Sequence, residues 1–101
     1  MRYHLWIEDN AKDEISRLPG NFRQRMRRTV SDLAYNPRPS IGKRLDLSDE
    51  GLAGLEIWRL RIDPWRVIYV IDDGAQEVGV LAVRKRPPYD YADVTELMGG
   101  L

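Results

Sequence analysis

The sequence predicts an α+β fold in which two antiparallel helices pack on one face of an antiparallel β-sheet. Three observations predict this class. Apolar residues recur at helical spacing between residues 11 and 33, and they alternate at strand spacing after residue 55. Short connections rich in Asp, Pro and Gly separate the predicted strands, so consecutive strands are expected to pair as a meander. With 101 residues, the chain is expected to form one domain around one core.

The first half of the chain predicts a strand followed by the helix pair. Residues 2–7 alternate apolar and polar side chains, which is typical of a short strand. Asn10 is expected to cap a first helix that ends at Pro19-Gly20. Asn21 is expected to cap a second helix that ends near Asn36, before two prolines. The apolar stripe of that second helix is Phe22, Met26, Thr29, Val30 and Leu33.

The second half predicts the sheet. Residues 44–47 are expected to form a short edge strand, and residues 56–62, 66–71 and 77–86 the three strands of the meander. Strict alternation in the last strand places Val78, Val80 and Ala82 on one face and Leu81 and Val83 on the other. After Pro87-Pro88, Asp90 is expected to cap a short C-terminal helix.

The composition excludes several kinds of site. Without cysteine, the chain forms no disulfide, thiolate metal site or cysteine nucleophile, and with a single histidine, His4, it forms no multi-histidine metal site. The 16 basic and 16 acidic residues balance, which argues against general nucleic-acid binding but not against a local basic surface. No apolar run approaches the roughly 20 residues of a membrane span, and no signal peptide is evident. We therefore expect a soluble, cytoplasmic domain without a membrane partner, metal or cofactor.

Arginines are expected to gather on one face of the sheet. Arg59 and Arg61 lie two apart in one strand and share a face, as do Arg84 and Arg86 in another. Arg66 begins the strand between them in sequence. If the helices cover the face of Trp58, Leu60 and Ile62, the arginine face is open. One interpretation is a phosphate-binding surface; the other is a solvated edge whose arginines pair with Asp63, Glu56 or Glu77.

Two tyrosines follow the last predicted strand. Tyr89 and Tyr91 come directly after Pro87-Pro88, close in sequence to Lys85 and the arginines. Aromatic rings beside clustered cations suit stacking on bases and contacts to phosphates, which is how single-stranded RNA is commonly held. The alternative is that each tyrosine packs against the sheet with its hydroxyl at the rim.

The residues also resemble a known family. The stretch IWRLRIDPWRVIYVIDD, followed by VGVLAVRKRPPYDY, resembles the RelE/ParE superfamily of type II toxins, which includes plasmid stabilisation proteins, and so do AKDEISRLP and LAYNPRP upstream. The resemblance covers nearly the whole chain and implies a single toxin domain over residues 1–101. It implies a cognate antitoxin that neutralises the toxin in a hetero-oligomer. The RelE branch cleaves messenger RNA on the ribosome without a metal, whereas the ParE branch inhibits DNA gyrase by protein–protein contact.

The resemblance carries over to individual positions. Arg66 and Arg86 match arginines of RelE, while Arg59 and Ile57 fall where RelE has catalytic lysines. The functional C-terminal tyrosine of RelE corresponds to Tyr89 or Tyr91. Arginine is a poor general base because its pKa stays above about 12, so the phosphate-binding half of the site is present and the proton-transfer half depends on a tyrosine.

These observations predict a RelE-like toxin that cleaves ribosome-bound messenger RNA. The alternatives are a ParE-like inhibitor of gyrase and a decayed toxin that retains only antitoxin binding. The expected catalytic residues are Arg59, Arg61, Arg66, Arg86, Tyr89 and Tyr91. Arg84 and Lys85 are expected to contact RNA, and no metal or cofactor takes part.

Overall fold

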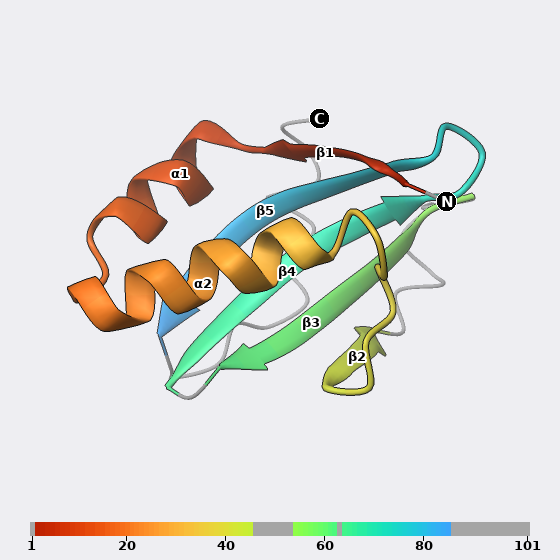
Figure 1. The fold of residues 1–101 in the computed structure, drawn as a ribbon. Helices are drawn as coiled ribbons and strands as arrows, with labels where there is room; N and C mark the ends of the chain where they lie inside the picture. Colours follow the sequence, from red (N-terminus) through yellow and green to blue (C-terminus); the bar gives the residue numbers. More distant parts are fainter. Residues whose placement is uncertain (1, 46–53, 63, 86–101) are drawn as a thin grey trace.

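The computed structural model describes residues 2–45, 54–62 and 64–85, and it confirms the α+β class. Two helices lie on one face of a five-stranded sheet (Figure 1). No helix in these ranges is long and apolar enough to cross a membrane. The elements follow in the order β1 (His4–Ile7), α1 (Asp9–Ser16), α2 (Gly20–Asp32), β2 (Gly42–Leu45), β3 (Glu56–Ile62), β4 (Trp65–Asp72) and β5 (Glu77–Lys85).

The sheet is mixed, with strand order β1-β5-β4-β3-β2. The antiparallel meander of β3, β4 and β5 is confirmed, and β2 extends it by pairing antiparallel with β3. The first strand pairs parallel with β5, with Leu5 opposite Val78. The helix pair and the rest of the sheet separate these two strands in sequence, as a parallel connection requires.

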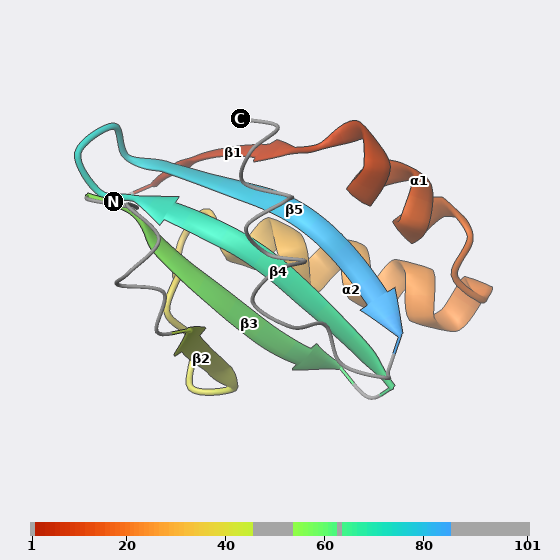
Figure 2. The ribbon, with the colours of Figure 1, turned by 180° about the vertical axis from the view of Figure 1, so that it is seen from behind.

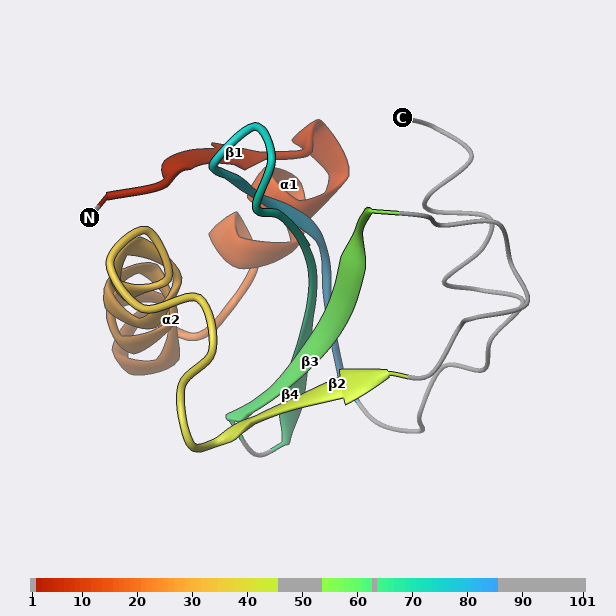
Figure 3. The same cartoon turned by 90° about the vertical axis from the view of Figure 1, so that its right-hand side faces the viewer.

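Both helices pack on the same face of the sheet, as the view along its edge shows (Figure 3). The predicted stripes form the core there: Ala11, Ile15 and Leu18 come from the first helical segment, and Met26, Val30 and Leu33 from the second. They meet side chains from β1, β3, β4 and β5, such as Leu60 and Tyr69. The reverse face, seen in Figure 2, carries a smaller buried cluster: Ile57, Ile68, Val70, Leu81 and Ala82.

The predicted helix boundaries need correction. α1 begins at Asp9 and α2 at Gly20, and neither has a side-chain cap, so the capping roles expected for Asn10 and Asn21 are wrong. The extended backbone of Pro19, with φ −53° and ψ 145°, starts α2 two residues earlier than expected. α2 ends at Asp32, and the chain continues in a turn that buries the next two side chains. β2 lies two residues before its predicted place. The predicted C-terminal helix lies outside the described residues.

A β-bulge in β5 overturns the predicted alternation of that strand. Ile68 pairs with Ala82 and Tyr69 pairs with Val80, so Leu81 is an extra residue opposite the gap. Leu81 and Ala82 therefore both face away from the helices, and Val83 returns to the helix side. The expected grouping of Ala82 with Val80, and of Val83 with Leu81, is wrong because the bulge reverses the faces after residue 81.

The loop between α2 and β2 is fastened to one end of the sheet by Arg38. Its guanidinium donates to Glu56 Oε1 at 3.2 Å and to Asp73 Oδ2 at 2.7 Å. Trp58 Nε1 also donates to Glu56 Oε1, at 2.9 Å, and the Tyr3 hydroxyl donates to Asp73 Oδ1, at 2.6 Å. The loop, β3, the β4–β5 turn and the start of β1 thus share one ionic network, which we call the Arg38 network.

The charges of the Arg38 network shift each other's pKa values. Hydrogen bonds from Arg38 and Trp58 lower the pKa of the Glu56 carboxyl. Hydrogen bonds from Tyr3 and Arg38 lower the pKa of the Asp73 carboxyl. The bond to Glu56, followed by that to Asp73, raises the pKa of Arg38. All three groups are therefore charged at neutral pH and hold the loop in place.

Tyr69 and Gly42 complete the attachment of this loop. The buried Tyr69 hydroxyl donates to the Pro37 carbonyl at 2.8 Å, and burial raises the pKa of Tyr69. Gly42 N donates to the Pro39 carbonyl at 2.9 Å. A Cβ at Gly42 would lie 3.1 Å from the Trp58 ring and 3.2 Å from the Tyr69 hydroxyl, so glycine is the residue that fits. These contacts fix where β2 begins and hence its register on β3.

We expect Arg38→Gln to destabilise the protein at pH 7 by about 1–2 kcal/mol, chiefly through the half-buried bond to Glu56. The control is Arg17→Gln, which removes an ion pair to Asp13 whose side chains are 77% and 63% exposed, and it should cost less than about 0.5 kcal/mol. Urea unfolding measures both.

The cost of Arg38→Gln should also depend on pH. Because folding lowers the pKa values of Glu56 and Asp73, the stability they contribute is complete above their unfolded values near about 4 and is lost as the pH falls through the folded values. The difference between wild type and Arg38→Gln should thus be full at pH 7 and shrink below about pH 4. An equal difference at pH 7 and pH 3 would contradict the assignment.

Candidate functional site

Three arginines stand in one row across the three central strands. Arg61 on β3 pairs with Arg66 on β4, and Arg66 pairs with Arg84 on β5. Directly opposed residues of neighbouring strands point to the same side of a sheet. That side is the one away from the helices, because Ile68, two residues after Arg66, belongs to the reverse-face cluster. We call these three residues the arginine row.

The arginine row differs in exposure along its length. Arg61 is exposed, Arg84 is half-buried and Arg66 is only 4% exposed, with Nη1 donating to the Trp65 carbonyl at 3.1 Å. The expectation that this face is fully open is therefore wrong for Arg66. Like charges directly opposite each other on adjacent strands oppose folding. In this row, Arg84 has the carboxylate of Glu14 as a counter-charge.

A second row of cations lies beside the first and includes a residue that sequence reasoning missed. Lys43 on β2 pairs with Arg59 on β3, and Arg59 pairs with Ile68. Lys43 is exposed and Arg59 is half-buried. Lys43 escaped prediction because the edge strand was expected to begin after it. No local pattern in the sequence marks this earlier start, because the register of β2 depends on its pairing with β3. We call Lys43 and Arg59 the Lys43 row.

An acidic residue of α1 holds one end of the arginine row. Glu14 Oε2 lies 3.5 Å from Arg84 Nε, and Glu14 Oε1 accepts a hydrogen bond from Val83 N at 2.9 Å. β1 pairs with β5 only as far as Val80. Glu14 therefore occupies the outer edge of β5 beyond β1, where it accepts the hydrogen bond from the Val83 N–H and forms an ion pair with Arg84.

Not all predicted site residues share this face. Lys85 pairs with Trp65, and its Nζ lies 5.9 Å from the centre of the Trp65 ring. Because Trp65 packs against the core under the helices, Lys85 lies on the helix side, away from the arginine row. The predictions for Arg86, Tyr89, Tyr91 and Asp63 fall on residues outside the described ranges.

Two of the three acids proposed as partners for the arginines, Glu56 and Glu77, are engaged elsewhere, and the third, Asp63, lies outside the described residues. Glu56 accepts from Arg38 and Trp58, and the Trp58 side of β3 faces the helices. Glu77 pairs with Asp72 and His4 at the opposite end of β5 from Arg84. Across residues 2–45, 54–62 and 64–85, His, Asp and Glu side chains do not gather in any group of three that would hold a metal ion.

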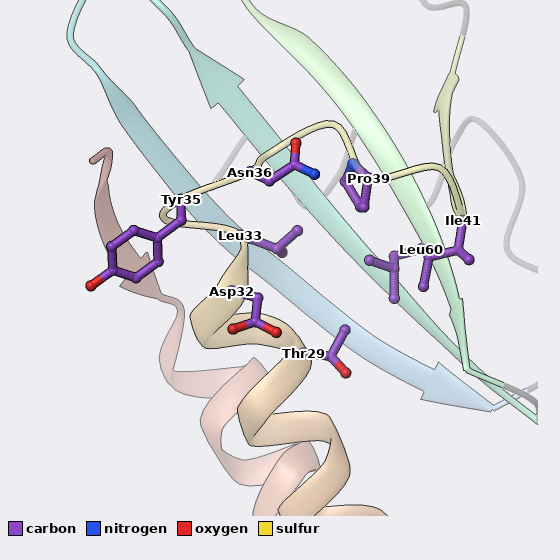
Figure 4. A pocket seen from close by; sticks show the side chains of 8 residues that line it. All are labelled: Thr29, Asp32, Leu33, Tyr35, Asn36, Pro39, Ile41 and Leu60. Atoms are coloured by element: carbon purple, nitrogen blue, oxygen red, sulfur yellow. The ribbon is translucent and has the colours of Figure 1, made fainter. Parts of the chain in front are cut away.

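A separate hollow of about 540 Å³ lies on the helix side, between the end of α2, the following loop and β3 (Figure 4). Apolar side chains of Leu33, Pro39 and Leu60 line it, with Asp32 and Asn36 at its polar side. Tyr35 and Ile41 also line it, and they are the large apolar residues most exposed in the described part of the chain, at 66% and 58%. Exposed apolar residues around one hollow indicate a surface for a partner.

Comparison with known proteins gives the chain a family. Residues 7–87 match the model of a family described as the ParE toxin of type II toxin–antitoxin system, parDE. No curated protein sequence matches the chain at a significant level.

Among solved structures, the chain is similar to one of the archaeal RelE–RelB complex from Pyrococcus horikoshii OT3, with 24% identity and a TM-score of 0.74 over 88% of this chain and 100% of that one. It is similar to one of the toxin–antitoxin complex RelBE2 from Mycobacterium tuberculosis, with 26% identity and a TM-score of 0.67 over 87% and 95%. The isolated E. coli RelE toxin has 21% identity and a TM-score of 0.61 over 98% and 99%. These likenesses show a shared fold.

The contact between Glu14 and Val83 gives a stability prediction with a matched pair of variants. Glu14→Ala should destabilise the protein by about 1–2 kcal/mol, because it leaves the Val83 N–H without its acceptor. Glu14→Gln keeps a side-chain carbonyl for Val83 and loses only the charge on the partly exposed Arg84, so it should cost less than about 0.5 kcal/mol. Chemical denaturation measures the stability of both variants. Equal losses of stability would show that the ion pair with Arg84, and not the hydrogen bond from Val83, provides the stabilisation.

Proposed function

The chain belongs to the ParE toxin family of type II toxin–antitoxin systems, and we propose that it arrests growth by cleaving messenger RNA on the ribosome, as RelE-like toxins do. The observation that carries the proposal is the arginine row together with the Lys43 row, five cations in adjacent register positions on one face. Their residues are Lys43, Arg59, Arg61, Arg66 and Arg84.

The chemistry of RNA cleavage requires such a face. When the 2′-hydroxyl attacks the neighbouring phosphate, negative charge grows on the two phosphoryl oxygens, and the bond to the leaving 5′-oxygen breaks. Planar guanidinium groups stabilise that charge with paired hydrogen bonds and need no metal ion. Arg61 stands beside Arg66 across β3 and β4, so the exposed Arg61 can bind the scissile phosphate directly and the largely buried Arg66 adds positive charge next to it. Arg84 extends the same row on β5.

Proton transfer requires a different kind of side chain. The 2′-hydroxyl must lose a proton and the 5′-oxygen must gain one, and arginine does neither well because it stays protonated. Tyr89 or Tyr91 is our candidate, acting with Arg86 close to the scissile phosphate. In this proposal the tyrosine either moves a proton or stacks on a base, and the cations of the two rows bind the phosphates.

We also propose an antitoxin as the partner of this chain. Two of the similar structures are complexes of a toxin with its antitoxin. The hollow lined by Tyr35 and Ile41 supports a docking position for apolar antitoxin side chains, because both are large apolar residues that are more than half exposed. It lies on the helix side of the sheet, so an antitoxin can occupy it without contacting the arginine row.

A second candidate function is inhibition of DNA gyrase. The observation that favours it is the family itself, since the matched model is the one of ParE toxins. In that case the five cations would form a protein-contact surface, and no proton-transferring residue would be needed. The two candidates differ in the molecule that changes: messenger RNA in the first and DNA in the second.

Cleavage of a message on purified ribosomes tests the proposed function. We expect wild type to cut a ribosome-bound message and Arg61→Gln or Arg66→Gln to lose at least about tenfold in rate, because each removes a positive charge that stabilises the transition state. The control is Arg28→Gln, an exposed arginine of α2 on the helix side, which should cut at the wild-type rate. Added chelator should leave the rate unchanged.

Three results would contradict this proposal. Wild type that leaves messages intact while it blocks gyrase supercoiling would replace it with the second candidate. Equal rates for Arg61→Gln, Arg66→Gln and Arg28→Gln in folded proteins, checked by circular dichroism, would remove the arginine row from the site. Loss of cleavage with chelator would point to a metal nuclease.

The proposed antitoxin surface predicts a separation of two activities. Ile41→Asp places a charge in the apolar hollow and should weaken antitoxin binding at least about tenfold, while growth arrest by the free toxin persists. The matched control is Ser40→Asp, the same change at the neighbouring exposed position. Co-purification and titration with the antitoxin encoded beside the toxin measure the effect, and equal affinities for both variants would place the antitoxin elsewhere.

A further inference from the structure

The cations of the reverse face fall into two rows with a regular separation. Arg59 and Arg61 are two residues apart on β3 and lie on the same side, which places the Lys43 row about 7 Å from the arginine row along the strand. That separation is close to the distance between successive phosphates of a nucleic acid strand. One row therefore matches one phosphate.

We infer that Lys43 and Arg59 form a second phosphate subsite, so that this face holds two successive phosphates of one RNA strand. The inference rests on the proposed function and adds the length and direction of the bound segment. Lys43 stands directly opposite Arg59 across β2 and β3, and its side chain is exposed, as a contact to a polymeric ligand requires. A lysine ammonium binds a phosphate as a point charge, without the fixed geometry that arginine demands.

The two rows are centred on different β-strands, and this offset sets the path of the bound RNA strand across the sheet. The arginine row is centred on Arg66 of β4. In the Lys43 row the positions on β4 and β5 are the apolar Ile68 and Ala82, so its charge lies over β3 and β2 only. An RNA strand that contacts both rows thus crosses the sheet obliquely, from β4 toward the edge formed by β2.

Among residues 2–45, 54–62 and 64–85, the charged surface stops after the second row. The next pair along the same strands on this face is Leu45 opposite Ile57, and both pack with the reverse-face cluster. A third phosphate in line with the first two would meet apolar side chains there. The described face therefore offers two phosphate positions in this direction, and a neighbouring phosphate beyond them should add little.

The position of Lys43 is fixed by the loop before it. A Cβ at Gly42 would be in tight contact with Trp58, Tyr69 and the Pro39 carbonyl, at 3.1 to 3.3 Å, and Pro39 follows the Arg38 network directly. These contacts hold β2 in the register that sets Lys43 against Arg59. A surface lysine whose backbone is held this firmly is better placed for one defined contact than a lysine on a free loop.

Binding of 2′-O-methyl oligoribonucleotides, whose blocked hydroxyls prevent cleavage, tests the inference. Each oligonucleotide carries one methylphosphonate, which removes the charge of one phosphate, and fluorescence anisotropy gives the affinity at several salt concentrations. Lys43→Gln should weaken binding several-fold and lower the slope of log affinity against log salt by about 0.7, the value for one phosphate contact in a single strand. Lys43→Arg should retain most of the affinity, and Lys12→Gln, an exposed lysine of α1, should retain all of it.

The methylphosphonates identify the phosphate that Lys43 contacts. At one position, adjacent to the one that depends on Arg61, the neutral group should weaken wild type several-fold and have no further effect on Lys43→Gln, because the variant has already lost that contact. If every methylphosphonate weakens the binding of Lys43→Gln as much as that of wild type, the second subsite is wrong. Equal affinities of Lys43→Gln and Lys12→Gln would also overturn it. Either result leaves the role of Arg61 intact. If Arg61→Gln also binds like wild type, or wild type binds no RNA, the proposed function fails together with the inference.

Discussion

The extra residue in β5 determines which side chains reach the reverse face of this sheet. Before the bulge, Val78 and Val80 face the helices; after it, Val83 does, and Arg84 turns to the reverse side in line with Arg66 and Arg61. Without the bulge, alternation from Val80 would direct Arg84 into the core beneath the helices, where an arginine is costly to bury. The same local irregularity therefore completes the apolar core on one side and the arginine row on the other.

A second constraint acts from the opposite edge of the sheet. The Arg38 network and the bond from Tyr69 to Pro37 attach the loop after α2, and Gly42 then enters β2 in close contact with Trp58. This sequence of contacts sets the register in which Lys43 meets Arg59. The basic face is thus assembled from both edges of the four strands β2 to β5, by a bulge in β5 and by an anchored loop before β2.

Much of this arrangement follows from local sequence patterns, and the rest depends on contacts that such patterns do not encode. The bounds of β3 and the meander are as predicted, since strict alternation and short turns specify them. The shared face of Arg59 and Arg61 follows from the same alternation. The bulge, the parallel pairing of β1 and the early start of β2 were not predicted, because each depends on a partner strand. Lys43 was missed for that reason, and the helix starts were misplaced because Asn10 and Asn21 were given capping roles that Glu8 and Pro19 make unnecessary.

The central claim is that the basic face acts on RNA. The most direct measurement is to induce the toxin in cells and, in one culture, to map the ends of messenger RNA across the transcriptome and to score gyrase-dependent DNA breaks. The account predicts new RNA ends within translated frames, absent when Arg61→Gln is induced to the same level, with DNA intact. DNA breaks with intact messages would contradict it and would make the five cations a surface for binding a protein.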